Sequence, residues 1–171
     1  MGGWNTGSFL ENTVLSVTAW RIVKQKYPAS KAFDGEGARL YGGRWNSRGV
    51  PVVYTAQSQS LAVLEMLVHL DAADLLQSYV FFEVKIDDAL ISALVKSDLP
   101  PDWQSDPGPP RLREIGDIWA ASNASVALRV PSSLIPAEYN YLLNPKHAEF
   151  GKLEFGEATP YRYDARLSQR K

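Results

Sequence analysis

The sequence has no cysteine and only two histidines, His69 and His147, in 171 residues. A chain without cysteine forms neither disulfides nor a thiolate metal site, and two histidines offer few ligands for a zinc centre. We therefore expect no metal. His69 falls at the end of an apolar helical run and His147 in a loop, where histidines are more often structural or exposed than catalytic.

Long apolar runs and an excess of positive charge are also missing. No segment reaches the roughly 20 apolar residues that span a bilayer, and the N-terminus lacks the charged-then-apolar order of a secretory signal. We therefore expect a cytoplasmic protein without membrane contact. The formal net charge is −1, which argues against direct nucleic-acid binding by this chain. A small molecule or a protein is the expected partner.

Several common catalytic motifs are absent as well. Gly35 and Gly37 lack the third glycine of a dinucleotide-binding fingerprint, and no GxxxxGK[ST] phosphate loop occurs. The sequence has no GxSxG nucleophile elbow and no HExxH zinc motif. Serine-hydrolase and zinc-protease chemistry are therefore not expected.

The length fits one ordinary globular domain. Residues 1–13 mix Gly, Asn, Thr and Ser without periodicity, so we expect a disordered or non-native N-terminal segment followed by a single domain over 14–171. Strands are predicted at 14–23, 50–56, 79–86 and 125–130, with short strand-like pieces near Phe155 and over 161–163. Helices are predicted from a capping Ser58 or Ser60 to about Leu70, and over 111–121 with Pro110 at the first turn.

The remaining segments are predicted as loops and turns. Residues 34–49 form a glycine-rich loop, a short helical or turn segment ends at Lys96, and 99–110 holds five of the eleven prolines. This proline-rich loop is long enough to act as a flap over a cleft. Strands and helices do not alternate regularly, which favours an α+β fold of compact mixed sheets with flanking helices over a doubly wound parallel sheet.

Glu65 is the residue that looks most out of place. In the run LAVLEMLVHL it follows Leu61 by four residues and lies between Leu64 and Val68 on the predicted apolar face of the helix. A carboxylate at this position faces the core or a cleft, and its burial needs either a cationic neighbour or a task. The residues alone leave two interpretations open, a structural ion pair and a functional carboxylate.

Arg44 is the second conspicuous residue. It follows two glycines, so its backbone can approach a ligand closely, and its guanidinium suits a phosphate or a carboxylate. Stacking on the adjacent Trp45 within a turn is the alternative. Arg21 lies among apolar neighbours in the first predicted strand, and Tyr54 shares a face of the second with Val52, where a tyrosine is usually part of the core.

Two long stretches, GEGARLYGGRWNSRGVPVVYTAQSQSLAVLEMLVHL and VPSSLIPAEYNYLLNPKH, resemble the RES-domain family of toxins encoded beside Xre-type antitoxins. The resemblance extends from about Trp20 to the tail YRYDARL and covers most of the chain. It places the arginine, glutamate and serine for which the family is named at Arg44, Glu65 and Ser132. The register of VPS is what favours Ser132 over the adjacent Ser133.

The resemblance implies an ADP-ribosyltransferase-like fold and an enzyme that cleaves the nicotinamide–ribose bond of NAD. It implies no cofactor: NAD is the substrate, and the acceptor is inorganic phosphate, as in an NAD phosphorylase, or water. Glu65 would hold ribose hydroxyls or stabilise oxocarbenium charge. Arg44 and Arg21, which also matches a functional position of the family, would clamp the pyrophosphate or the phosphate.

Tyr54 and Ser132 complete the implied site. Tyr54 also matches a functional position and would stack on a ring of the substrate, and Ser132 would orient ribose or phosphate through its hydroxyl. The implied catalytic residues are thus Glu65, Arg44 and Tyr54. Asn140 and Asn144 match the family too, but asparagines near proline commonly stabilise turns, so we interpret both as mainly structural.

The implied partner is an Xre-type antitoxin that covers the active site. Two alternatives to an NAD-degrading toxin stay open. A protein ADP-ribosyltransferase would use the same cleft to modify a protein. A non-catalytic protein-binding module would retain the arginine and the glutamate only as an ion pair.

Overall fold

The chain folds around one bent sheet of eight strands. The computed structural model describes residues 15–169, so the predicted N-terminal segment 1–13 lies outside the described residues. The strands are β1 (Ser16–Lys24), β2 (Val53–Ala56), β3 (Tyr79–Asp87), β4 (Ile91–Ala93), β5 (Ala127–Pro131), β6 (Tyr139–Leu143), β7 (Glu154–Phe155) and β8 (Thr159–Tyr161). The helices are α1 (Ala29–Ala32), α2 (Glu36–Tyr41), α3 (Gln59–Leu67), α4 (Ala72–Leu75) and α5 (Pro110–Ser122).

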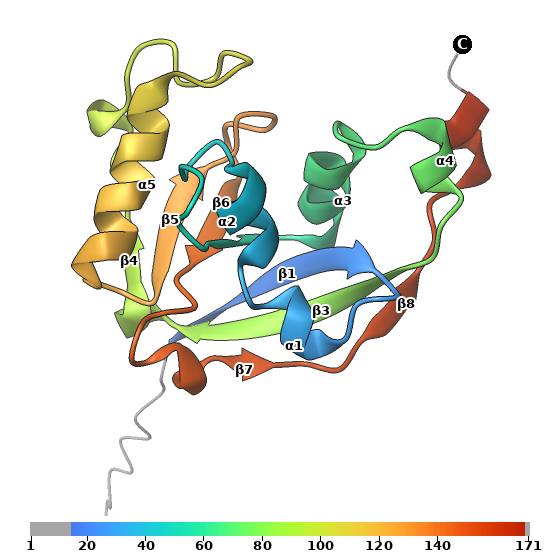
Figure 1. The fold of residues 1–171 in the computed structure, drawn as a ribbon, viewed down its shortest axis with the longest axis horizontal. Coiled ribbons are helices and arrows are strands. Elements are labelled where there is room, and N and C mark those ends of the chain that lie inside the picture. The colour runs from blue at the N-terminus through green and yellow to red at the C-terminus, as the bar shows by residue number, and fades with distance from the viewer. Residues whose placement is uncertain (1–14, 170–171) are drawn as a thin grey trace, which may run out of the picture.

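The strand order is β4-β5-β6-β2-β1-β3-β7, with β8 paired to β3. β1 pairs with β3 along its whole length but with β2 at a single position, Trp20 opposite Ala56. Beyond this pair β1 and β2 diverge. The sheet therefore bends between them, and Figure 1 shows β5 and β6 standing steeply to β1 and β3.

Each half of the sheet has its own helical cover. Trp119 of α5 packs in one cluster with the buried residues Leu128 and Leu142 of β5 and β6. In the other half, Leu61 of α3 packs in one cluster with Phe81 of β3. The bend thus lies between two separately packed apolar layers.

The predicted strands at 14–23, 50–56, 79–86 and 125–130 and the two predicted helices are all present, with ends shifted by a few residues. Five elements were not predicted: the short helices α1 and α4, and α2, β4 and β6. α2 lies inside the predicted loop 34–49, β4 replaces part of the predicted turn segment, and β6 contains Asn140. Pairing of β6 with β2 on one side and β5 on the other explains why an asparagine-containing segment is extended. Within residues 15–169, no helix is both long and apolar enough to cross a membrane.

α5 lies directly on the loop that joins α2 to β2. Gly116 is buried in the middle of α5, and a Cβ atom added to it would lie 1.7 Å from the carbonyl oxygen of Trp45. Only glycine allows the helix to approach the loop backbone this closely. The contact fixes the distance between α5 and the loop.

We expect Gly116→Ala to lower the free energy of unfolding by about 2 kcal/mol, because overpacking outweighs the gain in helix propensity. The matched control is Gly37→Ala in α2, where a Cβ meets no atom within 4 Å. Urea denaturation of both variants checks the prediction. Equal stability of the two variants would contradict it.

Candidate active site

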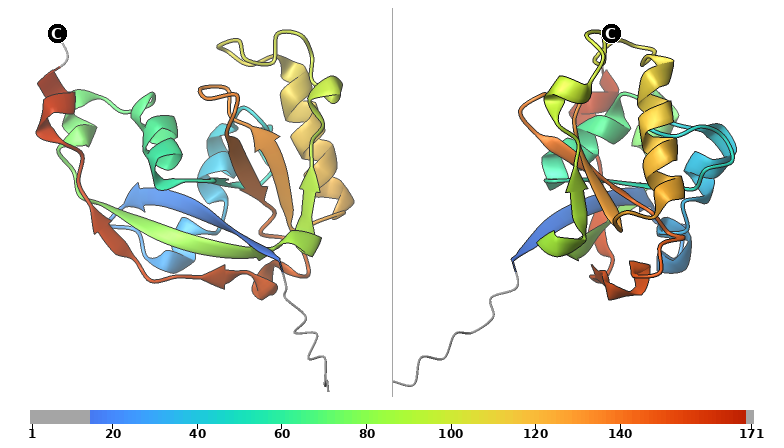
Figure 2. Two further views of the ribbon diagram at one scale, coloured as in Figure 1. Left: turned by 180° about the vertical axis from the view of Figure 1, so that it is seen from behind. Right: turned by 90° about the vertical axis from the view of Figure 1, so that its left-hand side faces the viewer.

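A cleft of about 980 Å³ opens beside the bend of the sheet. Strands β1 and β2, helices α2 and α3, the α2–β2 loop and residues within 104–108 all contribute to its lining. Figure 2 (left) shows α3 and α5 standing apart, with β1 and β3 running below both. Four of the predicted site residues, Arg21, Arg44, Tyr54 and Glu65, line this cleft.

Glu65 is held by two donors from the far half of the sheet. Its Oε1 accepts hydrogen bonds from Ser132 Oγ at 2.7 Å and from Asn140 Nδ2 at 2.6 Å. Its Oε2 has no hydrogen-bond partner among residues 15–169, and the side chain lines the cleft. One carboxylate oxygen is therefore anchored and the other is available to a ligand.

The two candidate serines differ in position. Ser132 is fully buried, and its hydroxyl also accepts hydrogen bonds from the backbone N–H groups of Leu134 and Ile135, both at 3.1 Å. Ser133 lines the cleft instead. Ser132 thus lies behind Glu65 and positions it, which differs from the expected direct contact of its hydroxyl with substrate.

Asn140 and Asn144 also differ in position and in what they bind. Asn144 is 2% exposed and donates to Ala120 O and Asn123 Oδ1, so its structural interpretation holds. Asn140 lies in β6 rather than in a turn, lines the cleft and binds Glu65. Interpreting Asn140 as a turn residue was wrong, because pairing in the centre of the sheet overrides the turn preference of asparagine.

The apolar face predicted for α3 was partly wrong. Leu61 is buried as expected, but Val68 is 54% exposed. Ala62, Glu65 and His69 line the cleft, so the face that carries the carboxylate borders a cavity and not the core. The side chain of Glu65 also forms no ion pair with the described residues. The alternative in which an arginine and Glu65 form a structural ion pair therefore finds no such ion pair among the described residues.

Arg21 bridges β1 to its neighbours through its guanidinium. Nε donates to Ala32 O, and Nη1 donates to Tyr54 O at 2.7 Å. Burial lowers the pKa of Arg21 to about 10, and the charge of Asp34 offsets only part of that effect. No carboxylate lies within ion-pair distance of Arg21 in the described part of the chain. An anion in the cleft would thus meet a desolvated cation.

The α2–β2 loop is organised by Asn46, which is fully buried. Its Nδ2 donates to Ala38 O at 2.9 Å and Val50 O at 3.0 Å, and its Oδ1 accepts from Tyr54 Oη at 2.7 Å. A Cβ at Gly43 would lie 2.5 Å from the Tyr54 hydroxyl oxygen, so the loop closes around this pair only with glycine. Burial raises the pKa of Tyr54, which keeps the phenol protonated at neutral pH.

Arg44 connects this loop to the proline-rich loop. Its Nη1 donates to Trp103 O at 3.1 Å and to Ser105 O at 2.9 Å. Trp45 is 2% exposed and packs under α5, so the alternative of Arg44 stacked on Trp45 was wrong. Asp106 of the proline-rich loop lines the cleft. Shielding of the cleft from water by this loop stays a prediction.

Several residues that line the cleft or support it escaped the sequence analysis as site residues. Asn46 and Asn140 act through tertiary hydrogen bonds that no local pattern reveals. His69 follows Glu65 by four residues on one helix, a spacing that places both on the same face. Asp106 and Arg113 had no such signal. Within the described residues, no three His, Asp or Glu side chains gather closely enough to hold a metal ion.

Comparison with known proteins gives consistent matches. The family model described as RES domain matches residues 18–164. "Toxin Res" of Yersinia enterocolitica is 42% identical over 149 residues, covering 86% of this chain and 97% of the relative. The "Prs ADP-ribosylating toxin" of a Sphingobium species is 35% identical over 158 residues, covering 90% of this chain and 98% of the relative.

A solved structure shares the fold. The crystal structure of the Mycobacterium tuberculosis MbcT–MbcA toxin–antitoxin complex contains a chain that matches with a TM-score of 0.72 at 20% identity, covering 91% of this chain and 88% of that one. The predicted fold class, α+β and ADP-ribosyltransferase-like, is confirmed.

Ser132→Ala is expected to lower the free energy of unfolding by about 1–3 kcal/mol, because it removes a hydrogen bond to a carboxylate and leaves two backbone donors without a partner. Ser133→Ala is the matched control, and we expect it to change stability by less than about 0.5 kcal/mol. Chemical denaturation compares the two. A larger loss in Ser133→Ala would reverse the assignment of the buried serine.

Proposed function

The chain belongs to the RES domain family, and from that membership we propose that it is the toxin of a toxin–antitoxin pair and degrades NAD by cleaving the nicotinamide–ribose bond. The observation that carries the proposal is Glu65, whose carboxylate is anchored through one oxygen and offers the other to a cleft that also holds Arg21 and Arg44. We expect the activity in the cytoplasm.

The proposed reaction needs a single carboxylate. The bond between ribose C1′ and the nicotinamide nitrogen breaks, its electron pair stays on nicotinamide, and an oxygen of phosphate or water forms the new bond to C1′. When water is the acceptor, it releases one proton to the solvent. Nicotinamide leaves as a neutral molecule, so no general acid is required. The free Oε2 of Glu65 stabilises the positive charge that develops on the ribose or holds its hydroxyls. Ser132 and Asn140 hold Oε1 of the same carboxylate and thereby orient Oε2.

The arginines supply the anion-binding part of the site. Nε and Nη1 of Arg21 donate hydrogen bonds to backbone carbonyls, which leaves Nη2 available to a ligand. In Arg44 only Nη1 donates to backbone carbonyls. These remaining donors suit the pyrophosphate of NAD or an incoming phosphate. The ring of Tyr54 forms part of the wall on which a substrate ring stacks, and its protonated hydroxyl does not act as a base.

We propose that an Xre-type antitoxin covers the cleft. Two side chains that line the cleft are unusually exposed for their type, Tyr41 at 77% and Val68 at 54%. Apolar and aromatic residues of this kind are enriched at protein interfaces. The fold shared with a chain from a toxin–antitoxin complex supports such a partner.

Transfer of ADP-ribose to a protein is the second candidate, favoured by the name of the Sphingobium relative. Product identity separates the two. We expect incubation with NAD and inorganic phosphate to yield ADP-ribose-1-phosphate by mass spectrometry. Free ADP-ribose regardless of phosphate indicates hydrolysis, and a protein that gains the ADP-ribose mass indicates transfer. Intact NAD with a folded sample would contradict NAD degradation.

Glu65→Gln tests the role of the charge alone, because glutamine keeps an oxygen that accepts from Ser132 and Asn140. We expect NAD turnover to fall by about 10²-fold or more, the size of effect seen when one electrostatic stabiliser of a transition state is removed. The control is Glu36→Gln, whose carboxylate pairs with Arg39 outside the cleft. Retained turnover in folded Glu65→Gln would overturn the mechanism.

A further inference from the structure

A second pocket of about 390 Å³ adjoins the cleft, between the α2–β2 loop and α5. It shares Tyr41, Gly42, Gly43 and Arg113 with the cleft, whereas Arg48 lines the second pocket and not the cleft. We infer that this pocket is an anion subsite in which Arg48 and Arg113 bind a phosphate group. Only the source of that phosphate rests on the proposed function: inorganic phosphate as co-substrate, or a phosphate of the dinucleotide.

The charges in this pocket are unbalanced. The side chains of Arg48 and Arg113 form no ion pair or hydrogen bond with residues 15–169. Arginines nearby are paired instead: Arg39 with Glu36 at 2.6 Å and Arg111 with Glu114 at 3.1 Å. Two guanidinium groups without counterions therefore line one cavity.

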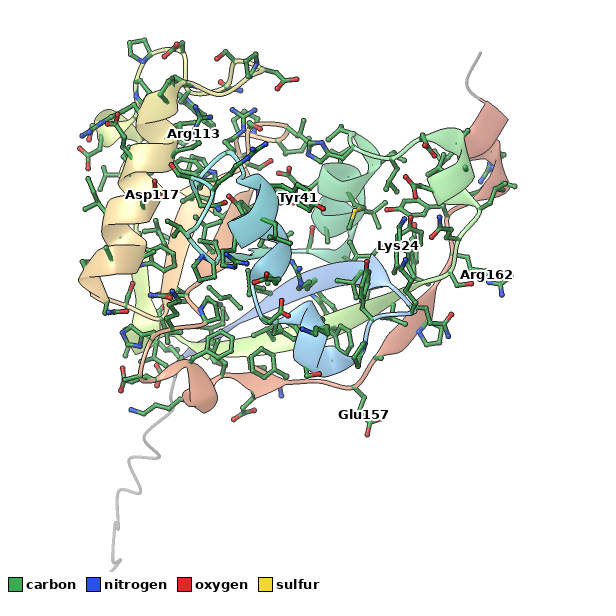
Figure 3. All side chains as sticks on the ribbon, viewed as in Figure 1. Lys24, Tyr41, Arg113, Asp117, Glu157 and Arg162 are labelled. Carbon is green, nitrogen blue, oxygen red and sulfur yellow. The ribbon has the colours of Figure 1, made fainter. Side chains whose placement is uncertain are left out.

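One acidic residue of α5 binds the backbone of the loop. Asp117 lies one turn after Arg113, and its Oδ1 accepts a hydrogen bond from Ser47 N at 2.8 Å. Figure 3 shows Arg113 on the side of α5 that faces Tyr41, with Asp117 further along the helix. Asp117 thus holds the loop against α5 just below Arg113, and no acidic side chain is among the described residues that line the pocket.

The two arginines come from different elements at a fixed separation. Arg48 follows Ser47 in the loop, and Arg113 precedes Gly116 by about one turn of α5. The bond from Ser47 to Asp117 and the close approach of Gly116 to Trp45 O hold the loop and the helix together. The backbone positions of the two arginines are therefore fixed relative to each other, and two guanidinium groups that line one cavity favour a tetrahedral oxyanion with several acceptor oxygens.

Equilibrium binding tests the subsite without relying on turnover. Isothermal titration calorimetry at low chloride measures the affinity of the protein for inorganic phosphate and, separately, for ADP-ribose. The variants are Arg48→Ala and Arg113→Ala. The control is Arg111→Ala, which removes an exposed arginine from the same helix outside both pockets.

We expect Arg48→Ala and Arg113→Ala each to weaken at least one probe by about tenfold or more, and Arg111→Ala to stay within about twofold of the unchanged protein. Weaker phosphate binding assigns the subsite to the free co-substrate, and weaker ADP-ribose binding alone assigns it to the dinucleotide. Unchanged affinity of folded Arg48→Ala for both probes overturns the inference. If the protein binds the probes in this arginine-dependent way but leaves NAD intact, the proposed function is contradicted and the subsite is supported.

Discussion

The cleft exists because the sheet opens at one point and the guanidinium of Arg21 spans the opening. β1 and β2 are paired only at Trp20 and Ala56. Beyond this pair, Arg21 Nη1 donates a hydrogen bond to the carbonyl oxygen of Tyr54, and Nε donates one to that of Ala32. A planar group with several donors bridges a gap that a backbone ladder cannot close. The Arg21 guanidinium is also buried and has no ion pair with the described residues. The side chain that spans the opening therefore also makes the cleft suited to anions.

The second constraint is the buried amide of Asn46. With its donors on the carbonyls of Ala38 and Val50 and its oxygen on the Tyr54 hydroxyl, it gives an irregular loop a single shape. That loop carries Arg44 toward the cleft and Arg48 toward the neighbouring pocket, and its backbone seats α5 at Gly116. One neutral side chain therefore determines where two charged ones lie.

The local sequence pattern was sufficient to predict helices and strands whose buried residues recur with the period of that element. Alternating apolar residues predicted β3, and the N-cap Ser58 and the helix-starting Pro110 predicted α3 and α5, because caps and period act over a few residues. β6 escaped prediction because its extended form depends on β2 and β5, which are distant in sequence. Likewise, the exposure of Val68 follows from the cavity beside α3, and helical spacing contains no information about a cavity.

For the site, sequence reasoning found Arg44 and Glu65 because charge in apolar or glycine-rich surroundings is locally visible. Sequence reasoning could not distinguish a residue that contacts a ligand from a residue that positions a ligand-contacting side chain. Ser132 matches the family position yet is fully buried, because the backbone after it turns back so that the N–H groups of Leu134 and Ile135 reach its hydroxyl. With those two donors in place, the hydroxyl proton is directed to Glu65. Oε1 of Glu65 is thereby occupied from within the fold, which leaves Oε2 as the oxygen that faces a ligand.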